Sequence, residues 1–240
     1  MAAQGSMIKL GNGTPAFLAN PAGGGPFPAV IVYIEAFGLN ENIKRICNRF
    51  ADEGYVAIAP DLYSSEGDGI AAYTEMPKAM ALMGKLADEK VVADAGSTIA
   101  YLKAQKNVKP KAIGATGYCM GGRLAFLTAC EFPDDIAATA HFYGGISAAR
   151  PGKTLVPMDE AKKLKCPVIL NYAELDAHIV HTVEVPIVEA RLKELGKQAE
   201  IVVHKGADHG FMCDDRASYH AEAAKAGWAS TFAHFKKYLK

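Results

Sequence analysis

Short apolar runs alternate with amphipathic segments along most of the chain. The runs are rich in β-branched, alanine and aromatic residues, which is typical of strands that are buried on both faces of a sheet. Six of them are expected to form strands, at 27–34, 55–59, 111–116, 137–143, 167–172 and 200–204. Strands separated by helices indicate βαβ units, so the pattern predicts an α/β fold with a mostly parallel sheet and helices on both faces.

The segments between these runs carry helix signals. Asn40 can cap a helix that ends at Gly54, and Pro186 is expected in the first turn of a helix that ends before Gly196. Residues 64–83 are rich in glycine, alanine and methionine, and they predict a loop with one short helix. Further helices are expected over 91–103 and 124–130, and in a final segment with an apolar stripe of Trp228, Phe232, Phe235 and Leu239. That stripe indicates core packing rather than binding.

Length and composition are consistent with one domain. The chain has 240 residues, of which 50% are hydrophobic, and neither an internal repeat nor a linker divides it. We therefore predict a single α/β domain over residues 1–240, with residues 1–12 loosely ordered. The 26 Lys and Arg residues balance the 26 Asp and Glu residues, and no local basic run breaks the balance. Such a chain has no electrostatic footprint for nucleic acid or an anionic membrane, so neither is an expected partner.

The N-terminal residues and the cysteines bear on the compartment. The first seven residues are mostly small or polar, without the charged and then apolar arrangement of a secretory signal, and the apolar runs are too short to span a membrane. The five cysteines show no disulfide-scaffold spacing and no CxxC pair, which argues against a structural zinc site. We expect reduced thiols and a cytoplasmic location. Monomer and homodimer both remain open.

The strongest local signal is the glycine-rich turn that follows the run at 111–116. Gly117, Cys119 and Gly121 have the spacing of a nucleophile elbow, in which cysteine takes the place of serine. Glycines flank such a nucleophile because the strained turn brings strand and helix close together. The helix N-terminus that follows favours a thiolate and a developing oxyanion, and the backbone N–H of Met120 can donate to that oxyanion. The alternative is a buried, inert cysteine in a tight turn.

Two further residues follow strands in an order that favours chemistry. Asp176 comes after the run at 167–172, and His209 comes after the run at 200–204. Nucleophile, acid and histidine in this chain order are typical of the α/β-hydrolase fold. His209 would take the thiol proton of Cys119 and later protonate the leaving alcohol, while Asp176 would orient the imidazole. These residues predict a cysteine hydrolase that works on a small molecule without a cofactor.

With this triad, the chain from about residue 25 to its last helix resembles the dienelactone hydrolase family of the α/β-hydrolase superfamily. The most specific match is the run IEAFGLN at 34–40. The resemblance implies that Glu35 contacts the resting cysteine, that substrate displaces this carboxylate, and that the N–H of Ala36 is a second oxyanion donor. A carboxylate beside the thiol disfavours the thiolate by like-charge repulsion and so protects the resting enzyme.

The resemblance also implies an activity and a pocket. The family opens small lactones and esters, so we expect a carboxylic ester hydrolase of the carboxymethylenebutenolidase type that forms a thioester acyl-enzyme. Phe37 lies in the IEAFGLN run, and Tyr143 lies in the run FYGG at 142–145. Both aromatic residues are expected to line the substrate pocket.

The arginines that the resemblance leads us to expect are not evident. Dienelactones, the family's best-known substrates, carry a carboxylate that two arginines hold. In the family, one arginine lies in the loop that follows the strand and its run DLY, which is 61–63 here, and the other lies shortly after the catalytic histidine. Between residues 61 and 90 this chain has no arginine, only Lys78, Lys85 and Lys90. Cys213 stands four residues past His209, with Arg216 further on, and Arg123 lies on the elbow helix. Since no bidentate carboxylate clamp is evident, the substrate remains open.

Two other functions stay open at this point. A thiol-based redox protein could cycle Cys119 through sulfenic acid, although no second cysteine is close in sequence and the triad would have no purpose. A non-catalytic binding module of the same fold would be favoured by a broken triad, whereas all three members are present. A metal site at His178 and His181 has Asp176 as its only neighbouring acid, so no metal is expected.

Overall fold

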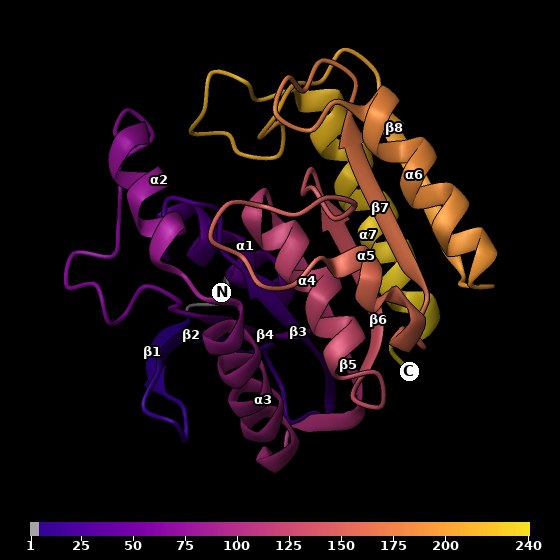
Figure 1. The fold of residues 1–240 in the computed structure, drawn as a ribbon. Coiled ribbons are helices and arrows are strands. Elements are labelled where there is room, and N and C mark those ends of the chain that lie inside the picture. The colour runs from indigo at the N-terminus through magenta and orange to yellow at the C-terminus, as the bar shows by residue number, and fades with distance from the viewer. Residues whose placement is uncertain (1–4) are drawn as a thin grey trace.

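A computed structural model describes residues 5–240. Within these residues, eight strands form one sheet in the order β1-β2-β4-β3-β5-β6-β7-β8 (Figure 1). Their bounds are β1 Ser6–Lys9, β2 Pro15–Ala19, β3 Phe27–Tyr33, β4 Val56–Pro60, β5 Val108–Tyr118, β6 Ile136–Phe142, β7 Val168–Ala173 and β8 Ala199–His204. Neighbours from β4 through β8 pair in parallel, whereas β2 pairs antiparallel with both β1 and β4. The mostly parallel sheet predicted from the pattern is confirmed.

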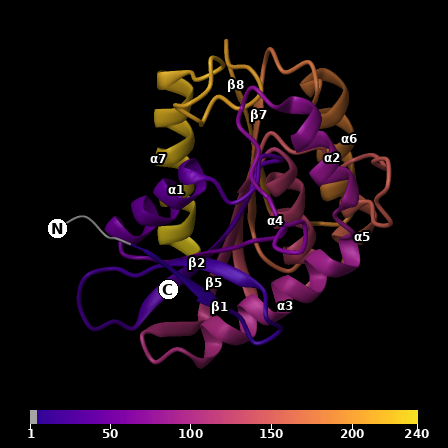
Figure 2. The ribbon, with the colours of Figure 1, turned by 90° about the vertical axis from the view of Figure 1, so that its left-hand side faces the viewer.

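Helices cover both faces of this sheet, as Figure 2 shows. On one face lie α1 (Glu41–Asp52) and α7 (Ala221–Tyr238), where the Phe50 ring contacts the ring of Trp228. On the other side lie α2 Met76–Lys85, α3 Asp88–Ala104, α4 Met120–Glu131, α5 Pro157–Glu160, the 3₁₀ turn η1 Ala161–Lys163 and α6 His181–Glu194. No helix of the described residues is long and apolar enough to span a membrane.

Local sequence signals explain several element boundaries. The side-chain oxygen of Asn40 accepts a hydrogen bond of 3.2 Å from the N–H of Ile43, so it caps α1 as predicted. Gly54 follows that helix with a φ of 89°, a conformation that glycine adopts without steric cost. The aromatic stripe of α7 packs into the core, where Phe235 is fully buried. Core packing was the predicted role of that stripe.

Two helix predictions were wrong in their boundaries. Pro186 lies inside α6, which begins at His181, rather than in the first turn of a helix. A proline there leaves the carbonyl of Thr182 without its helical N–H partner, and water can replace that partner because both residues are exposed. The elbow helix α4 begins at Met120, directly after the cysteine, rather than at residue 124.

The N-terminal segment also differs from expectation. The sequence predicted loose order over residues 1–12, yet Ser6–Lys9 form β1 and pair with β2. This pairing supplies the backbone hydrogen bonds that a short, mostly exposed strand cannot satisfy alone. Residues 1–4, which belong to the same prediction, lie outside the described residues.

Because β3, β5, β7 and β8 run parallel, they bring the candidate residues to the same end of the sheet. Glu35 follows β3, Cys119 follows β5, Asp176 follows β7 and His209 follows β8. All four therefore lie beyond the carboxyl ends of strands that point the same way. Ligands of open α/β sheets bind at this end, so the fold offers these side chains a common site.

Candidate active site

Cys119 occupies a strained turn between β5 and α4. Its φ of 56° and ψ of −121° lie outside the regions that L-residues favour. A Cβ on Gly117 would overlap the backbone of Gly121, and a Cβ on Gly121 would overlap the carbonyl oxygen of Tyr33. The two flanking glycines thus permit the close approach of strand and helix that the elbow requires. Cys119 itself is only partly buried, so a small substrate can reach its sulfur.

His209 and Asp176 are hydrogen-bonded to each other. His209 Nδ1 lies 2.7 Å from Asp176 Oδ2, and the carboxylate side chain is 1% exposed. The other oxygen, Oδ1, accepts hydrogen bonds from the backbone N–H groups of His178 at 2.8 Å and Ile179 at 2.9 Å. Because the carboxylate is held at both oxygens, it fixes the imidazole orientation and directs Nε2 away from itself.

The charges around His209 favour the imidazolium. Burial alone would lower the pKa of His209, but the negative charge of Cys119 and hydrogen bonds to Asp176 and Cys119 raise that pKa to about 10. Burial would likewise raise the pKa of Asp176, but the hydrogen bond to His209 and the two backbone N–H groups lower it below its usual range. The arrangement can therefore stabilise the imidazolium that forms when His209 takes up a proton.

Two side chains flank the His209 ring. The ring of Tyr143 makes an edge contact with a centroid distance of 5.1 Å, and the ring of His178 makes another at 5.2 Å. Tyr143 has a φ of 38° and is 1% exposed, and its hydroxyl has no hydrogen-bond partner among residues 5–240. Sequence reasoning expected Tyr143 beside the site, which agrees with this contact, whereas His178 had been considered only as a metal ligand.

The two predicted oxyanion donors lie at suitable chain positions. Met120 is the first residue of α4, where backbone N–H groups have no helical acceptor. Ala36 follows Glu35 after β3 and is 4% exposed. Neither N–H has a partner among the turn, loop and cap hydrogen bonds of the described chain. Both can therefore serve a charged oxygen of a ligand.

Glu35 is buried beside this group and pairs with an arginine. Its Oε1 accepts from Arg216 Nη1 at 3.3 Å, its side chain is 1% exposed, and its Oε2 has no hydrogen-bond partner within residues 5–240. Burial raises the pKa of Glu35, although Arg216 and His209 act in the opposite direction. No hydrogen bond joins Glu35 to Cys119 in the same residues, and the hydrogen bond of this carboxylate comes from Arg216.

Arg216 is a site residue that sequence reasoning left unassigned. Its guanidinium carbon lies 5.5 Å from the ring centre of Phe37 and 5.8 Å from that of Tyr73. Gly210 has a φ of 86°, and a Cβ there would overlap the guanidinium. Cys213 stands four residues after His209, and Arg216 follows it. The sequence spacing therefore did not indicate that the Arg216 side chain reaches the site.

Tyr73 links the loop after β4 to the same cluster. Its hydroxyl oxygen accepts from Asn40 Nδ2 at 3.0 Å and from Cys213 Sγ at 3.2 Å. Its ring packs edge-on against Phe37 with a centroid distance of 4.7 Å. The hydroxyl also lowers the pKa of Glu35, though less than Arg216 does. No sequence signal marked this tyrosine, because it lies in the glycine-rich segment without a periodic pattern.

Several other candidates lie apart from the cluster. Arg123 pairs with Asp88 at 2.8 Å, and Lys78 forms an exposed pair with Asp68 at 2.5 Å. Neither cation is joined to the candidate catalytic residues by a hydrogen bond or ion pair in the described chain. Among residues 5–240, no group of three or more His, Cys, Asp or Glu side chains is arranged to hold a metal ion.

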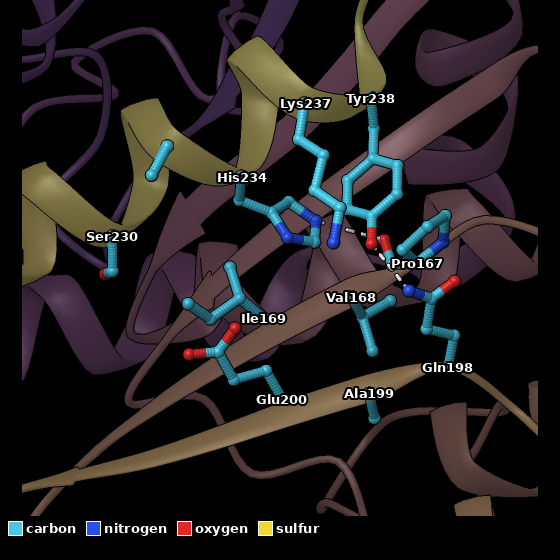
Figure 3. Close-up of a pocket in the computed structure, with 11 residues that line it drawn as sticks. Pro167, Val168, Ile169, Gln198, Ala199, Glu200, Ser230, His234, Lys237 and Tyr238 are labelled. Atoms are coloured by element: carbon cyan, nitrogen blue, oxygen red, sulfur yellow. Dashed lines mark hydrogen bonds between the residues drawn. The ribbon is translucent and has the colours of Figure 1, made fainter.

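A separate cavity lies at the opposite end of the sheet. It has a volume of about 380 Å³ and is lined by the first residues of β7 and β8 and by the last turns of α7 (Figure 3). There Gln198 donates a hydrogen bond of 2.5 Å to the hydroxyl of Tyr238, and the His234 ring lies 3.3 Å from the carbonyl oxygen of Pro167. None of the candidate catalytic residues lines this cavity, so it is not part of the site.

Comparison with known proteins shows which family this chain matches. The model of the dienelactone hydrolase family matches residues 14–239. The chain belongs to the dienelactone hydrolase family. A relative from Methylorubrum extorquens, named "Putative carboxymethylenebutenolidase", is 37% identical over 233 residues, which are 93% of this chain and 77% of the relative. A relative with the same name from Synechocystis is 36% identical over 230 residues, which are 93% of this chain and 92% of the relative.

Solved structures support the same assignment for this family member. A crystal structure from Klebsiella pneumoniae, titled "Putative Dienelactone Hydrolase", matches with a TM-score of 0.91 and 36% identity, over 99% of this chain and 100% of that chain. The phosphotriesterase P91 from metagenomic libraries, described as dienelactone hydrolase-like, matches with a TM-score of 0.81 but 21% identity, which bears on the fold alone. The predicted α/β-hydrolase fold and the class of ester- or lactone-hydrolysing enzymes are thereby confirmed.

Proposed function

We propose that this dienelactone hydrolase family member opens small lactones or esters through a Cys119, His209 and Asp176 triad and a thioester acyl-enzyme. The observation that carries the proposal is the hydrogen bond of 2.7 Å between His209 Nδ1 and the buried Asp176 carboxylate. This bond occupies Nδ1 and leaves Nε2 as the nitrogen available to the nucleophile. The proposal is also supported by the strained elbow that presents Cys119 at the carboxyl end of β5.

The proposed acylation begins with the transfer of the Cys119 proton to His209 Nε2. The sulfur then attacks the carbonyl carbon of the substrate, and the negative charge on the carbonyl oxygen is stabilised by the N–H groups of Met120 and Ala36. When the bond from this carbon to the ester oxygen breaks, His209 donates its proton to the leaving oxygen. Asp176 stabilises the imidazolium throughout. The product of this half-reaction is a thioester.

Deacylation uses the same groups in reverse. His209 takes a proton from water, and the resulting hydroxide attacks the thioester carbon. The carbon–sulfur bond breaks, the carboxylic acid leaves, and the sulfur regains its proton from His209. In a lactone the leaving oxygen stays attached to the acyl chain, so a single hydroxy acid is released after the second step.

Glu35 is proposed to restrain the nucleophile before substrate binds. Its buried carboxylate disfavours an additional negative charge on Cys119, and Arg216 holds that carboxylate at 3.3 Å. The oxygen Oε2, which has no partner within residues 5–240, can accept a thiol proton if substrate shifts the side chain. Phe37 and Tyr143 are proposed to line the pocket, because Phe37 packs beneath Arg216 and Tyr143 contacts His209.

The test is the substitution Cys119→Ala, with Cys166→Ala as its control. Cys166 is a free thiol like Cys119, but it is buried and lies before β7, at the far end of the strands. We expect Cys119→Ala to abolish the hydrolysis of p-nitrophenyl acetate, and Cys166→Ala to retain it. The unsubstituted enzyme should release one equivalent of p-nitrophenol in a burst and gain the mass of one acetyl group, if a thioester accumulates.

Three outcomes would contradict the proposal. Activity that survives in Cys119→Ala would exclude this cysteine as the nucleophile. Peroxide consumption with a thiol reductant, in the absence of any esterase activity, would favour the redox alternative. Substrate binding without turnover would favour the binding module. Unfolding curves that coincide for the two variants would show that folding does not account for the difference.

We also propose that residues 1–240 form one domain and that the protein is cytoplasmic. The first point is supported by the single sheet that contains all eight strands of the described residues. The second is supported by the five cysteines, all of which are free thiols.

A further inference from the structure

Arg150 differs from the other arginines of this chain. Five of the six arginines contact an acidic or aromatic partner: Arg45 with Asp214, Arg49 with Trp228, Arg123 with Asp88, Arg191 with Glu194 and Arg216 with Glu35. Within residues 5–240, the Arg150 side chain has no ion pair, hydrogen bond or ring contact, although the residue is half-buried. A half-buried guanidinium without a counter-charge is suited to meet an anion that the protein does not itself supply.

Arg150 packs against two segments that each carry a residue in contact with His209. Its guanidinium packs against Gly145, where a Cβ would overlap it, and a Cβ at the same place would lie 2.9 Å from the side chain of Ile179. Gly145 is two residues from Tyr143, and Ile179 directly follows His178. Tyr143 and His178 are the two residues whose rings contact His209. Arg150 thus lies where the two segments that enclose His209 meet.

The order of the strands in the sheet puts Arg150 and Arg216, the arginine that pairs with Glu35, on different sides of the nucleophile. The nucleophile follows β5, which lies between β3 and β6 in the sheet. Glu35 and Phe37 follow β3, and Arg216 packs over Phe37 on that side. Arg150 follows β6 and packs near Ile179, which follows β7. The two guanidinium groups therefore belong to opposite sides of the nucleophile.

The loop that carries Arg150 is held at several points. The N–H groups of Thr154 and Leu155 donate to Asp88 Oδ2 at 3.0 and 2.9 Å, and Arg123 Nη2 donates to the Leu155 carbonyl at 2.6 Å. The Lys153 ammonium donates to the carbonyl of Met83 at 2.7 Å. Because buried charged groups fasten this loop, the backbone near Arg150 is held in place, which lowers the entropy cost of binding a ligand there.

We propose that Arg150 is a specificity-determining residue that binds a carboxylate on the leaving group of the substrate ester. This inference rests on the proposed function. The carbonyl oxygen of the substrate points to the N–H groups of Ala36 and Met120, and the leaving oxygen must face His209 to receive its proton. The leaving group consequently extends toward β6 and β7, the side on which Arg150 lies. A planar guanidinium matches a carboxylate there with two parallel hydrogen bonds.

The test compares three aryl esters that differ in whether and where they carry a carboxylate. Phenyl acetate is neutral, 4-acetoxybenzoate carries a carboxylate on its leaving group, and monophenyl succinate carries one on its acyl group. The ratio kcat/KM is measured for each ester with the unsubstituted enzyme, Arg150→Gln, Arg150→Lys and the control Arg191→Gln. Arg191 is a suitable control because it pairs with Glu194 in the last turn of α6.

We expect Arg150→Gln to lower kcat/KM for 4-acetoxybenzoate by about ten- to a hundred-fold, the range for loss of a charged hydrogen bond. Phenyl acetate and monophenyl succinate should change by less than about two-fold, since neither places a charge near Arg150. With 4-acetoxybenzoate, the kcat/KM of Arg150→Lys should lie between those of the unsubstituted enzyme and Arg150→Gln, because an ammonium retains the charge but not the bidentate geometry. Arg191→Gln should behave like the unsubstituted enzyme with all three esters.

Other results would overturn the inference. An equal loss with all three esters would make Arg150 a structural residue, and a loss confined to monophenyl succinate would place it on the acyl side. No change with any ester would remove it from substrate recognition. Failure of the proposed function can be distinguished from failure of this inference. In that case the unsubstituted enzyme would have no Cys119-dependent turnover of phenyl acetate, the ester that does not involve Arg150.

Discussion

Two buried carboxylate–arginine pairs of this protein differ in how completely their charges are satisfied. Asp88 accepts from Arg123 at 2.8 and 3.0 Å and from two backbone N–H groups, so its oxygens have four hydrogen bonds. Glu35 accepts from Arg216 once, at 3.3 Å, and its Oε2 has no partner in the described residues. Both carboxylates are 1% exposed, so burial alone does not explain the difference.

The pKa values of the two carboxyls shift in opposite directions. Burial would raise the pKa of Asp88, but Arg123 and the Leu155 N–H lower it below its usual value. Burial raises the pKa of Glu35, and Arg216 does not offset this effect. A fully hydrogen-bonded pair is thus suited to holding a loop in place, whereas an incompletely bonded one is suited to changing its partners during a reaction.

The largest effect on stability is expected for Asp88→Asn. The substitution leaves Arg123 buried without its counter-charge, so the free energy of unfolding should fall by about 3–5 kcal/mol. Urea unfolding at neutral pH measures this change. Glu89→Gln is the matched control, because Glu89 is the neighbouring acid and forms an exposed hydrogen bond to Thr154 of the same loop. Equal unfolding midpoints for the two variants would contradict a stabilising role of the Asp88 pair.

The same pair predicts a pH dependence. Asp88 has a lowered pKa in the folded protein, so its stabilising effect is present above its ordinary pKa of 3.8 and is lost as the pH falls through the lowered value. The difference in unfolding free energy between the unsubstituted protein and Asp88→Asn should therefore shrink below about pH 4. A difference that stays constant in acid would show that charge is not its cause.

A smaller effect of the opposite sign is expected for Glu35→Gln. Since the folded protein raises the pKa of Glu35, a neutral side chain should be as stable as the carboxylate or more so at pH 7. This gain should disappear as the pH falls through the raised pKa, and be absent below the ordinary value of 4.5, where glutamate is itself neutral. Urea unfolding at several pH values measures it. A loss like that of Asp88→Asn would mean that the two pairs do not differ.

Glu35→Gln also tests the restraint on the nucleophile. Removal of the carboxylate should change the rate at which iodoacetamide alkylates Cys119, because a neighbouring negative charge disfavours the thiolate. The rate is followed by loss of free thiol and by the mass of the modified protein. An unchanged rate would remove Glu35 from the mechanism.

The smallest effect is expected for Tyr73→Phe. The hydroxyl accepts from Asn40 and Cys213, and its loss should cost about 0.5–1.5 kcal/mol of unfolding free energy. Because this hydroxyl lowers the pKa of Glu35, its removal should raise the pH at which the Glu35 charge begins to slow Cys119 alkylation. Tyr101→Phe, on α3 and away from the cluster, is the control. Identical profiles for the two variants would separate Tyr73 from the Glu35 charge.

The reactive end of the sheet could be predicted from sequence because its signals are local. Gly117, Cys119 and Gly121 have a fixed spacing, and Asp176 and His209 each follow an apolar run that forms a buried strand. The strands β1 and β2 could not be predicted in this way. They are short, β1 is mostly exposed, and β2 pairs with β4 far along the chain.

The partners of the arginines could not be predicted at all. Arg123 lies one turn past the nucleophile, yet it pairs with Asp88 on α3. Arg216 follows His209 within an irregular loop, and the turn at Gly210 and the rings of Phe37 and Tyr73 decide that it reaches Glu35. No periodic pattern in the sequence marks either pairing, because each depends on segments that meet only in the folded chain.

The sequence by itself determined the alternation of the six parallel strands with helices, the glycines of the elbow, and the chain order of Cys119, Asp176 and His209. These features depend on backbone conformation and on the burial of apolar runs, which neighbouring residues control. Only the tertiary structure decided which carboxylate is fully hydrogen-bonded and which arginine has no partner within residues 5–240. Ion pairing depends on distance and on the exclusion of water, and both are set by residues remote in sequence.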